Sequence, residues 1–292
     1  NVKALEQALA EIVKRHESLR TRFEDVGGVP QQVIDEAGEW KLKLVDLSRA
    51  DEKELEAQRV ASADAQRPFV LAQEWGMRTQ LLRLDDMDHI LVLTMHHIVS
   101  DGWSLGVLFE ELHRLYEAYT RGEHYSPLPK LELQYADFSV WQRDWLGTAQ
   151  PEKQLNYWKE QLAGATPAEL AIAKPRPSAP SFHGEKQSLR LSPELISRLH
   201  GLARAEGATL FMVMFAAFQA LLSRYTGQSD TCVGTPVANR NRAELESLIG
   251  VFVNTLVLRT DLSGGPSFAE LLQRVRETAL AGYAHQDLPF EK

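Results

Sequence analysis

The stretch LTMHHIVSDGWS, residues 93–104, decides how this chain folds and where its chemistry should be sought. An apolar, β-prone run ends at two adjacent histidines, His96 and His97, and Asp101 and Gly102 follow. Buried strands rarely carry ionisable groups, because a buried charge costs free energy unless it is paired. These side chains are therefore either hydrogen-bonded inside a core or catalytic residues at the junction between a strand and a helix.

The residues around this stretch predict strands and helices in alternation. Residues 19–34, LRTRFEDVGGVPQQVI, and residues 77–99 both show hairpin patterns. The strand that runs into the histidines has little alternation, so we expect it to be buried on both faces. From Ser104 onward the apolar residues fall on one helical stripe, and Gly122 is placed to end that helix.

A second set of elements follows a stretch rich in proline and small residues at 164–184, which predicts a linker. KQSLRL, residues 186–191, predicts a strand, and residues 209–225 are apolar nearly all round, which predicts a core helix. The chain is thus expected to be α/β, with layered α+β character, in two lobes comprising residues 1–170 and 171–292.

Composition excludes several classes of function. The 292 residues are 44% hydrophobic with a net charge of −8, so a sizeable core is available and a basic nucleic-acid surface is not expected. Cys232 is the single cysteine, which argues against a disulfide framework and a thiolate metal site and suits a reducing, cytoplasmic compartment. The longest apolar runs are too short to span a bilayer. Because the first residue is Asn1, we expect an excerpt of a longer polypeptide.

The two histidines admit three explanations. Adjacent strand residues point to opposite faces, so His96 and His97 are poor joint ligands for one metal, and no HExxH helix is present. Both can be core residues with hydrogen-bonded rings. A histidine at a strand end is also suited to proton transfer. Without a phosphate loop, a dinucleotide fingerprint or a GxSxG elbow, acyl transfer by direct attack of the acceptor is the favoured chemistry.

MHHIVSDGWS resembles the HHxxxDG signature of condensation domains of nonribosomal peptide synthetases, members of the chloramphenicol acetyltransferase-like superfamily. Four further family motifs are present, and together with the histidine motif they stand in the family's order: RHESLRTRF (15–23), YADFSVWQR (135–143), IGVFVNTLVLR (249–259) and HQDLPFEK (285–292). The resemblance covers residues 1–292, without the family's first motif and last portion. SDGWS resembles the subtype that accepts an L-configured donor. One departure is PFVLAQEWGM, with Trp75 and Met77, where the family commonly reads PFDL and GPL.

This resemblance implies two acetyltransferase-like lobes in a V-shaped pseudodimer, with the active site in a tunnel between them and the second lobe incomplete here. It also implies amide-bond formation between a donor thioester and an acceptor amine, both tethered to peptidyl carrier proteins by phosphopantetheine arms. The expected partners are these carriers and adjoining adenylation and carrier domains of a longer synthetase. No metal, no directly bound cofactor, no nucleic acid and no membrane is expected.

The resemblance also assigns roles to residues. His97 carries over as the catalytic histidine, either as a general base or as a group that positions the amine. His96, Gly102 and Asp101 carry over as structural residues of the active site. The arginine that pairs with Asp101 is expected in RHESLRTRF, as Arg20 or Arg15. Residues expected to line the tunnel are Trp103, Ser104, Asn254 and Thr255.

Two other functions remain open at this stage. An epimerisation domain of the same family would exchange an α-proton with the same histidine. A non-catalytic scaffold would bind carrier proteins and be indifferent to substitution of His97. Because the family's last portion is missing, residues 1–292 alone are expected to lack condensation activity.

Overall fold

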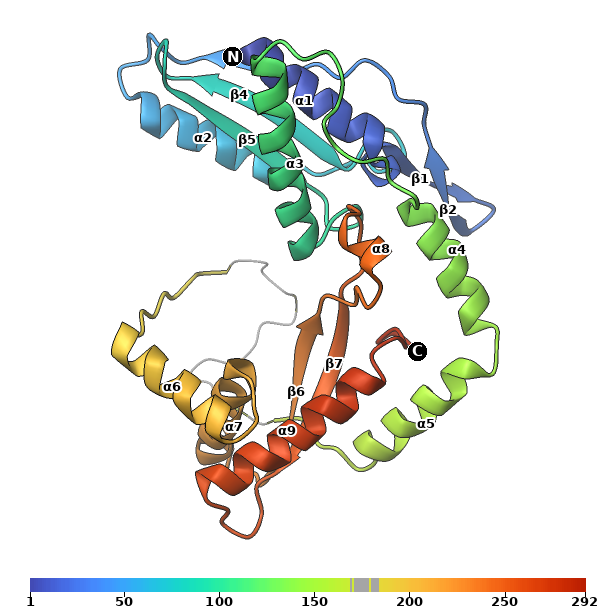
Figure 1. Ribbon diagram of the computed structural model, residues 1–292, viewed down its shortest axis with the longest axis vertical. Coiled ribbons are helices and arrows are strands. Elements are labelled where there is room, and N and C mark those ends of the chain that lie inside the picture. Colours follow the sequence, from blue (N-terminus) through green and yellow to red (C-terminus); the bar gives the residue numbers. More distant parts are fainter. Residues whose placement is uncertain (169, 171–178, 180–183) are drawn as a thin grey trace. The chain divides into compact units, whose positions relative to one another are not determined.

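The computed structural model describes residues 1–168, 170, 179 and 184–292, so part of the predicted linker lies outside the described residues. The described residues divide into two compact units, each of which contains both helices and strands (Figure 1). The predicted α/β class is therefore confirmed.

The bounds of the two units differ from those of the predicted lobes. Unit 1 comprises Asn1–Gly147 and Ala238–Val253, and unit 2 comprises Thr148–Val237 and Asn254–Lys292. The first segment of unit 1 thus ends before the proline-rich stretch. Unit 1 also takes in residues 238–253, which we call the crossing segment, because these residues pack against elements far away in sequence.

Unit 1 begins with a helix and a hairpin. Helix α1, Val2–Arg15, is capped by the side chain of Asn1 and leads through the short 3₁₀ helix η1, Glu17–Arg20, into the antiparallel strands β1, Thr21–Val26, and β2, Val29–Ile34. Gly27 and Gly28 both have positive φ, 65° and 84°, which glycine adopts without steric cost. The predicted hairpin is confirmed.

The carboxylate of Asp35 closes the base of this hairpin. Nε and Nη2 of Arg22 donate to it at 2.8 Å each, and the indole N–H of Trp75 donates at 2.8 Å. The hydrogen bonds from Arg22, followed by that from Trp75, lower the pKa of Asp35 to about 2. Trp75 also stacks on Trp40, and Met77 is buried. Both residues of the stretch PFVLAQEWGM, which differs from the family's usual sequence, are therefore packed in the fold.

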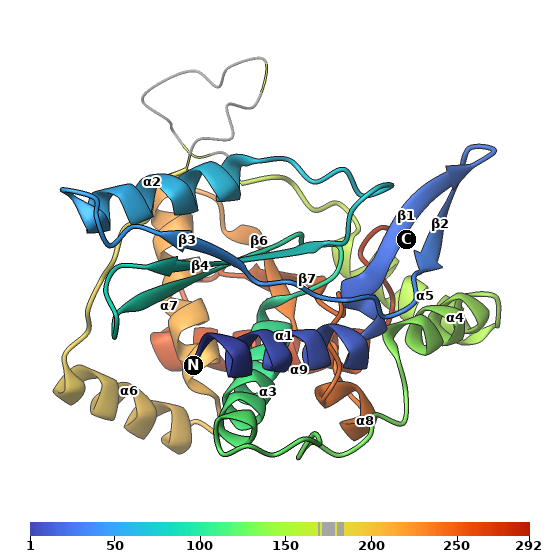
Figure 2. The ribbon, with the colours of Figure 1, turned by 90° about the horizontal axis from the view of Figure 1, so that it is seen from above.

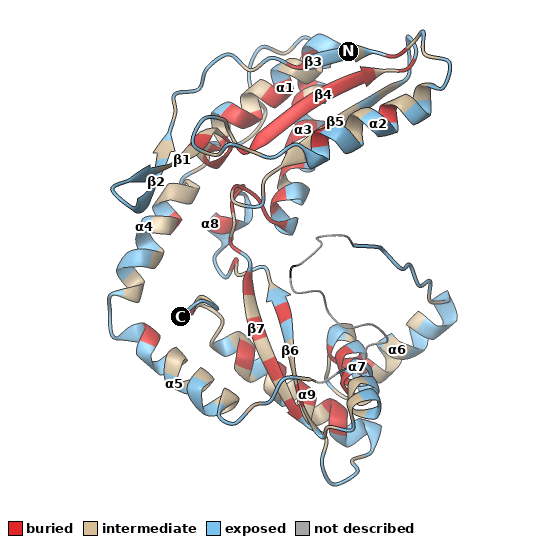
Figure 3. Ribbon diagram, turned by 180° about the vertical axis from the view of Figure 1, so that it is seen from behind, coloured by how far each residue is buried: buried red, intermediate tan, exposed pale blue. Residues whose placement is uncertain are grey.

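A three-stranded sheet follows the hairpin, with the order β3, Lys43–Asp46, β4, Met77–Arg83, and β5, His89–Met95. Helix α2, Lys53–Gln66, lies on one face and α1 on the other (Figure 2). The prediction that β5 is buried on both faces is wrong. β4 is the buried strand along nearly its whole length (Figure 3), because it lies between β3 and β5, whereas β5 is at the edge of the described sheet.

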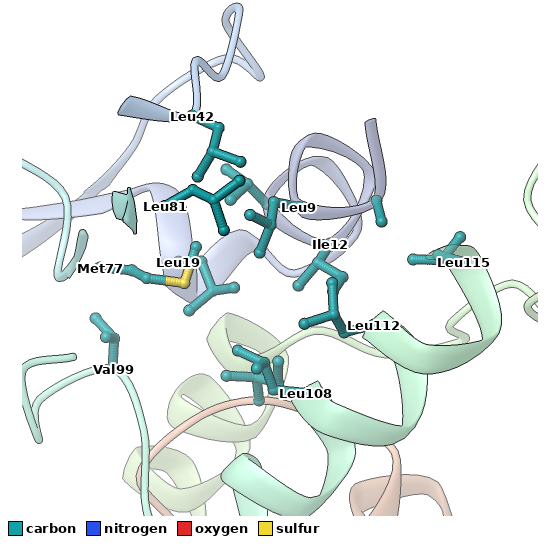
Figure 4. Packing of buried hydrophobic residues seen from close by; sticks show 13 residues of the cluster. Leu9, Ile12, Leu19, Leu42, Met77, Leu81, Val99, Leu108, Leu112 and Leu115 are labelled. Carbon is teal, nitrogen blue, oxygen red and sulfur yellow. The ribbon is translucent and has the colours of Figure 1, made fainter. Parts of the chain in front are cut away.

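Helix α3, Gly102–Thr120, begins directly after Asp101 and ends before Gly122, whose φ is 85°. Its buried leucines meet those of α1 and β4 in the main core of unit 1 (Figure 4). Two further helices belong to this unit: α4, Tyr135–Leu146, and α8, Ala243–Glu246, within the crossing segment. The start of α3 is therefore attached to a packed core.

Unit 2 is built on the antiparallel strands β6, Asp230–Val237, and β7, Asn254–Asp261. Among its described residues, the core of unit 2 joins these strands to three of the four helices and to Trp158 of the fourth. The helices are α5, Gln150–Leu162, α6, Pro193–Ala205, α7, Leu210–Thr226, and α9, Phe268–Ala284.

Two predictions for unit 2 are wrong. Residues 186–191 form no strand, and Leu189 is 85% exposed, because no described strand lies beside them to complete a ladder. Helix α7 buries Met212, Val213, Phe215 and Ala216 but exposes a second apolar side. The two-stranded sheet and the neighbouring helices cover only one side of α7 in the described residues.

In the described part of the chain, no single helix has the length and apolar composition of a membrane span. Helices α6 and α7 together have this length and apolar composition, but the chain bends by 100° between them.

Candidate active site

The two motif histidines lie in a turn that follows the end of β5 at Met95. The backbone N–H of His96 donates to the carbonyl of Gly76 at 2.8 Å, and that of Val99 donates to the carbonyl of His96 at 3.1 Å. We call residues 96–100 the His97 turn. The ladder ends one residue before His96, so the condition under which adjacent strand residues point to opposite faces does not hold for these two histidines.

The ring of His96 takes part in the turn itself. Its Nδ1 accepts the backbone N–H of Ile98 at 3.0 Å, so Nδ1 carries the lone pair and a neutral ring holds its proton on Nε2. The ring is half-buried and lies edge-on to Phe69, with 5.7 Å between the ring centroids. This side chain has a hydrogen-bonding role within the turn.

His97, the next residue, is exposed at the turn. The far side of the turn is tightly packed, because a Cβ at Gly76 would lie 2.7 Å from a methyl group of Val99. The backbone that carries the His97 imidazole is thus fixed by close packing, while the ring itself is free to meet a ligand.

Asp101 follows the turn and caps α3. This residue is 5% exposed, and its carboxylate accepts the backbone N–H of Ser104 at 2.8 Å and that of Phe252 at 3.0 Å. Burial alone would raise the pKa of Asp101. The hydrogen bonds from Phe252 and Ser104, together with the charge of Arg240, outweigh burial and hold this pKa below its ordinary value.

Arg240 is the cation that neutralises Asp101. Its Nη2 lies 3.2 Å from Oδ1 of Asp101, and both side chains are buried. Burial lowers the pKa of Arg240, and Asp101 opposes that shift. The charge of Asp101 and its hydrogen bond favour the charged form of the Arg240 guanidinium.

The prediction that Arg20 or Arg15 pairs with Asp101 is wrong. Arg15 donates to Glu111 at 2.8 Å, and Arg20 donates to the carbonyl of Asp35 and to Glu17. The true partner lies 139 residues away in sequence, in the crossing segment. The sequence signal that could have found it is the arginine-containing stretch ANRNR, which follows the apolar strand TCVGTPV.

Hydrogen bonds to backbone groups attach the crossing segment to the rest of unit 1. The carbonyl of Ile249 accepts from Ser18 at 2.6 Å, and the carbonyl of Val251 accepts from Tyr135 at 3.0 Å. The indole of Trp103, a residue expected to line the tunnel, donates to the carbonyl of Glu246 at 2.9 Å and remains partly exposed. Gly250 leaves no room for a side chain, because a Cβ would lie 2.2 Å from the ring of Tyr135.

A buried group of charges lies beneath this segment. Nε2 of His16 is 2.7 Å from Glu111, and Nδ1 accepts the backbone N–H of Ile249 at 3.3 Å. Arg15 bonds the other carboxylate oxygen of Glu111. In the described residues, no group of three or more histidine, cysteine, aspartate or glutamate side chains could hold a metal ion.

The two remaining predicted lining residues, Asn254 and Thr255, belong to unit 2. Asn254 is 8% exposed, and its side-chain amide donates to the carbonyls of Gln286 and Leu288 and accepts from the backbone N–H of Phe290. It therefore shapes the segment 286–290. Thr255 contributes to an apolar pocket with Leu155, Trp158, Val257 and Phe290.

Comparison with known proteins assigns this arrangement to a family. The family model for the condensation domain matches residues 1–292. The chain is similar to one of the linear gramicidin synthase proteins of Brevibacillus parabrevis, at 52% identity, and to chondramide synthase cmdD of Chondromyces crocatus, at 45%. Both alignments cover 100% of this chain but only 6% and 8% of those proteins.

Two solved structures have the same fold. The X-domain from teicoplanin biosynthesis matches with a TM-score of 0.89 at 32% identity, and the first condensation domain of the calcium-dependent antibiotic synthetase with 0.83 at 28%. Each match covers 100% of this chain and 65% or 68% of the solved one. Because the family model extends over the whole of this sequence and the fold agrees, the chain belongs to the condensation-domain family.

Proposed function

We propose that this domain is an acyltransferase that joins two carrier-bound aminoacyl groups in nonribosomal peptide synthesis. The observation that carries the proposal is the exposed imidazole of His97 on a turn held by Gly76 at one end and by the buried Asp101 at the other. The similar proteins support it: two are named synthases, and the antibiotic synthetase domain is described in complex with a substrate analogue.

The reaction proceeds without a covalent acyl-enzyme intermediate. The amine nitrogen of the acceptor attacks the carbonyl carbon of the donor thioester, a C–N bond forms, and the C–S bond breaks. The phosphopantetheine thiolate leaves with the electron pair and takes up the proton that the amine loses. His97 either accepts that proton first or holds the amine in line for attack, and a general base contributes about 10²–10⁴-fold.

The substrates and partners follow from this reaction. The donor and acceptor arrive on phosphopantetheine arms of two peptidyl carrier domains, in a longer cytoplasmic synthetase with adenylation domains. SDGWS favours an L-configured donor. No cofactor bound by the domain itself enters the chemistry.

The test is mass spectrometry of loaded donor and acceptor carriers after incubation with the full-length polypeptide. We expect a dipeptide on the acceptor carrier, and its loss in the His97→Ala variant. Persistence of condensation at a near wild-type rate in a folded His97→Ala protein would show that the assignment of His97 is wrong.

A non-catalytic docking scaffold is the second candidate, because a related X-domain is described in complex with a second protein, OxyB. A scaffold would retain carrier protein and form no dipeptide, with or without His97. An epimerisation domain would instead incorporate solvent deuterium at the α-carbon of a bound aminoacyl thioester. The same mass spectra distinguish all three outcomes.

A further inference from the structure

The hydroxyl of Ser104 has an unusual number of polar neighbours. Ser104 is fully buried in the first turn of α3. Its Oγ lies 2.7 Å from Oδ1 of Asp101 and 2.8 Å from the carbonyl oxygen of Gly250. It also accepts the backbone N–H of Gly250 at 3.1 Å and Nη2 of Arg240 at 3.0 Å.

These contacts use the full capacity of a hydroxyl group. A serine hydroxyl has one proton to donate and two lone pairs to accept with. Both lone pairs are taken by Gly250 and Arg240, and the single proton faces two acceptors, Asp101 and the carbonyl of Gly250. No other serine side chain contacts both members of the Asp101–Arg240 pair in the described ranges. Loss of the hydroxyl would remove one hydrogen-bond partner each from Asp101, Arg240 and the backbone of Gly250, all of which are buried, and this lowers the free energy of unfolding.

The position of Ser104 connects these contacts to the proposed catalytic histidine. Asp101 directly follows the His97 turn, and its orientation depends on Ser104, Phe252 and Arg240. Resting on the proposed function, we infer that Ser104 is a positioning residue: its hydroxyl holds Asp101 and the crossing segment together and thereby sets the place of the His97 imidazole. The tunnel-lining role predicted for Ser104 is replaced by this one, because a fully buried hydroxyl cannot meet substrate.

A purely structural role would predict something different, and Ser18 provides the matched control. Its hydroxyl is also buried and donates to the same crossing segment, at Ile249, the residue before Gly250. Ser18 contacts neither Asp101 nor Arg240 through any described hydrogen bond. Removing either hydroxyl weakens the attachment of the crossing segment, but only loss of the Ser104 hydroxyl disturbs the Asp101 carboxylate.

The experiment compares Ser104→Ala with Ser18→Ala in the full-length polypeptide. We expect a lower melting temperature in both variants, with the larger fall in Ser104→Ala because its hydroxyl has more buried partners. We also expect a loss in kcat of about 10- to 100-fold for Ser104→Ala alone, with KM for the acceptor carrier little changed, since a small misplacement of a reacting group has effects of this size. Equal kcat values for the two variants would overturn the inference.

A second readout does not depend on activity. In protein labelled with ¹⁵N in the histidine rings, the ring signals of His97, assigned by their loss in His97→Ala, should shift in Ser104→Ala and stay in place in Ser18→Ala. Unchanged ring signals would overturn the inference even if the proposed condensation reaction holds, and shifted ones support it even if no dipeptide forms. If Ser104→Ala does not fold, Ser104→Cys and Ser18→Cys replace the alanine pair, because a thiol is of similar shape but a weak hydrogen-bonding group.

Discussion

The guanidinium of Arg240 lies 3.2 Å from the carboxylate of Asp101, and 139 residues of sequence separate the two. Both are buried, and the hydroxyl of Ser104 contacts each of them. This pair joins the end of the His97 turn to the crossing segment. Removing either member of this pair should therefore lower the free energy of unfolding before it affects catalysis.

Replacing Asp101 or Arg240 by alanine should lower the free energy of unfolding by about 3–5 kcal/mol, because the remaining charge is left buried and unpaired. The loss of unfolding free energy in the double variant should be smaller than the sum of the losses in the two single variants, because the double variant leaves no unpaired buried charge. Urea unfolding measures all three. Arg242→Ala, at a neighbouring exposed arginine, is the control and should change little. An unchanged melting temperature with lost activity in Asp101→Ala would mean that Asp101 acts on substrate directly.

Replacing His96 by alanine should reduce stability modestly, by about 0.5–1.5 kcal/mol, because the backbone N–H of Ile98 loses its acceptor. Condensation should slow far less than in His97→Ala. Thermal melts and the carrier assay, run on both variants, check this contrast. A larger loss of rate in His96→Ala than in His97→Ala would reverse the two roles.

Replacing Gly250 by alanine should destabilise the fold by about 1–3 kcal/mol, the usual range for overpacking, because the new Cβ would lie 2.2 Å from the ring of Tyr135. The ring must move, and its hydrogen bond to Val251 weakens with it. Gly106→Ala is the matched control: it lies within α3 with nothing within 4 Å of its Cβ position, and alanine favours a helix. Equal melting temperatures for the two variants would contradict the predicted clash.

The Asp35 carboxylate should give the hairpin an acid-sensitive stability. Its pKa is about 2 in the folded chain and about 3.9 in an unfolded one, so the folded state binds fewer protons. The stabilisation is therefore complete above about pH 4 and is lost as the pH falls through 2. Urea midpoints of the wild type and of Asp35→Asn should differ at pH 7 and converge between pH 4 and pH 2. Glu36→Gln, at the exposed neighbour, should show no such convergence.

Local patterns in the sequence were sufficient where the deciding interactions are local. The turn between β1 and β2 has positive φ at two successive residues, and the sequence supplies the adjacent glycines Gly27 and Gly28 there. Helix α6 begins with Ser192 as cap and Pro193 as first residue. Such features involve residues within one turn of each other, so spacing alone predicts them.

Burial and pairing across the fold could not be predicted in the same way. The apolar run of β5 looks buried on both faces, but its burial depends on which strands lie beside it, and β4 occupies the centre. Likewise, α7 is apolar all round, yet its exposure depends on what packs against it.

The candidate site shows the same division most clearly. The motif placed His96, His97 and Asp101 together, because they are close neighbours in the chain. The cation that pairs with Asp101 was assigned to nearby arginines, yet it is Arg240, brought in by the crossing segment. A buried carboxylate requires a partner charge, and sequence reveals that requirement. Packing of distant segments selects the arginine that meets it.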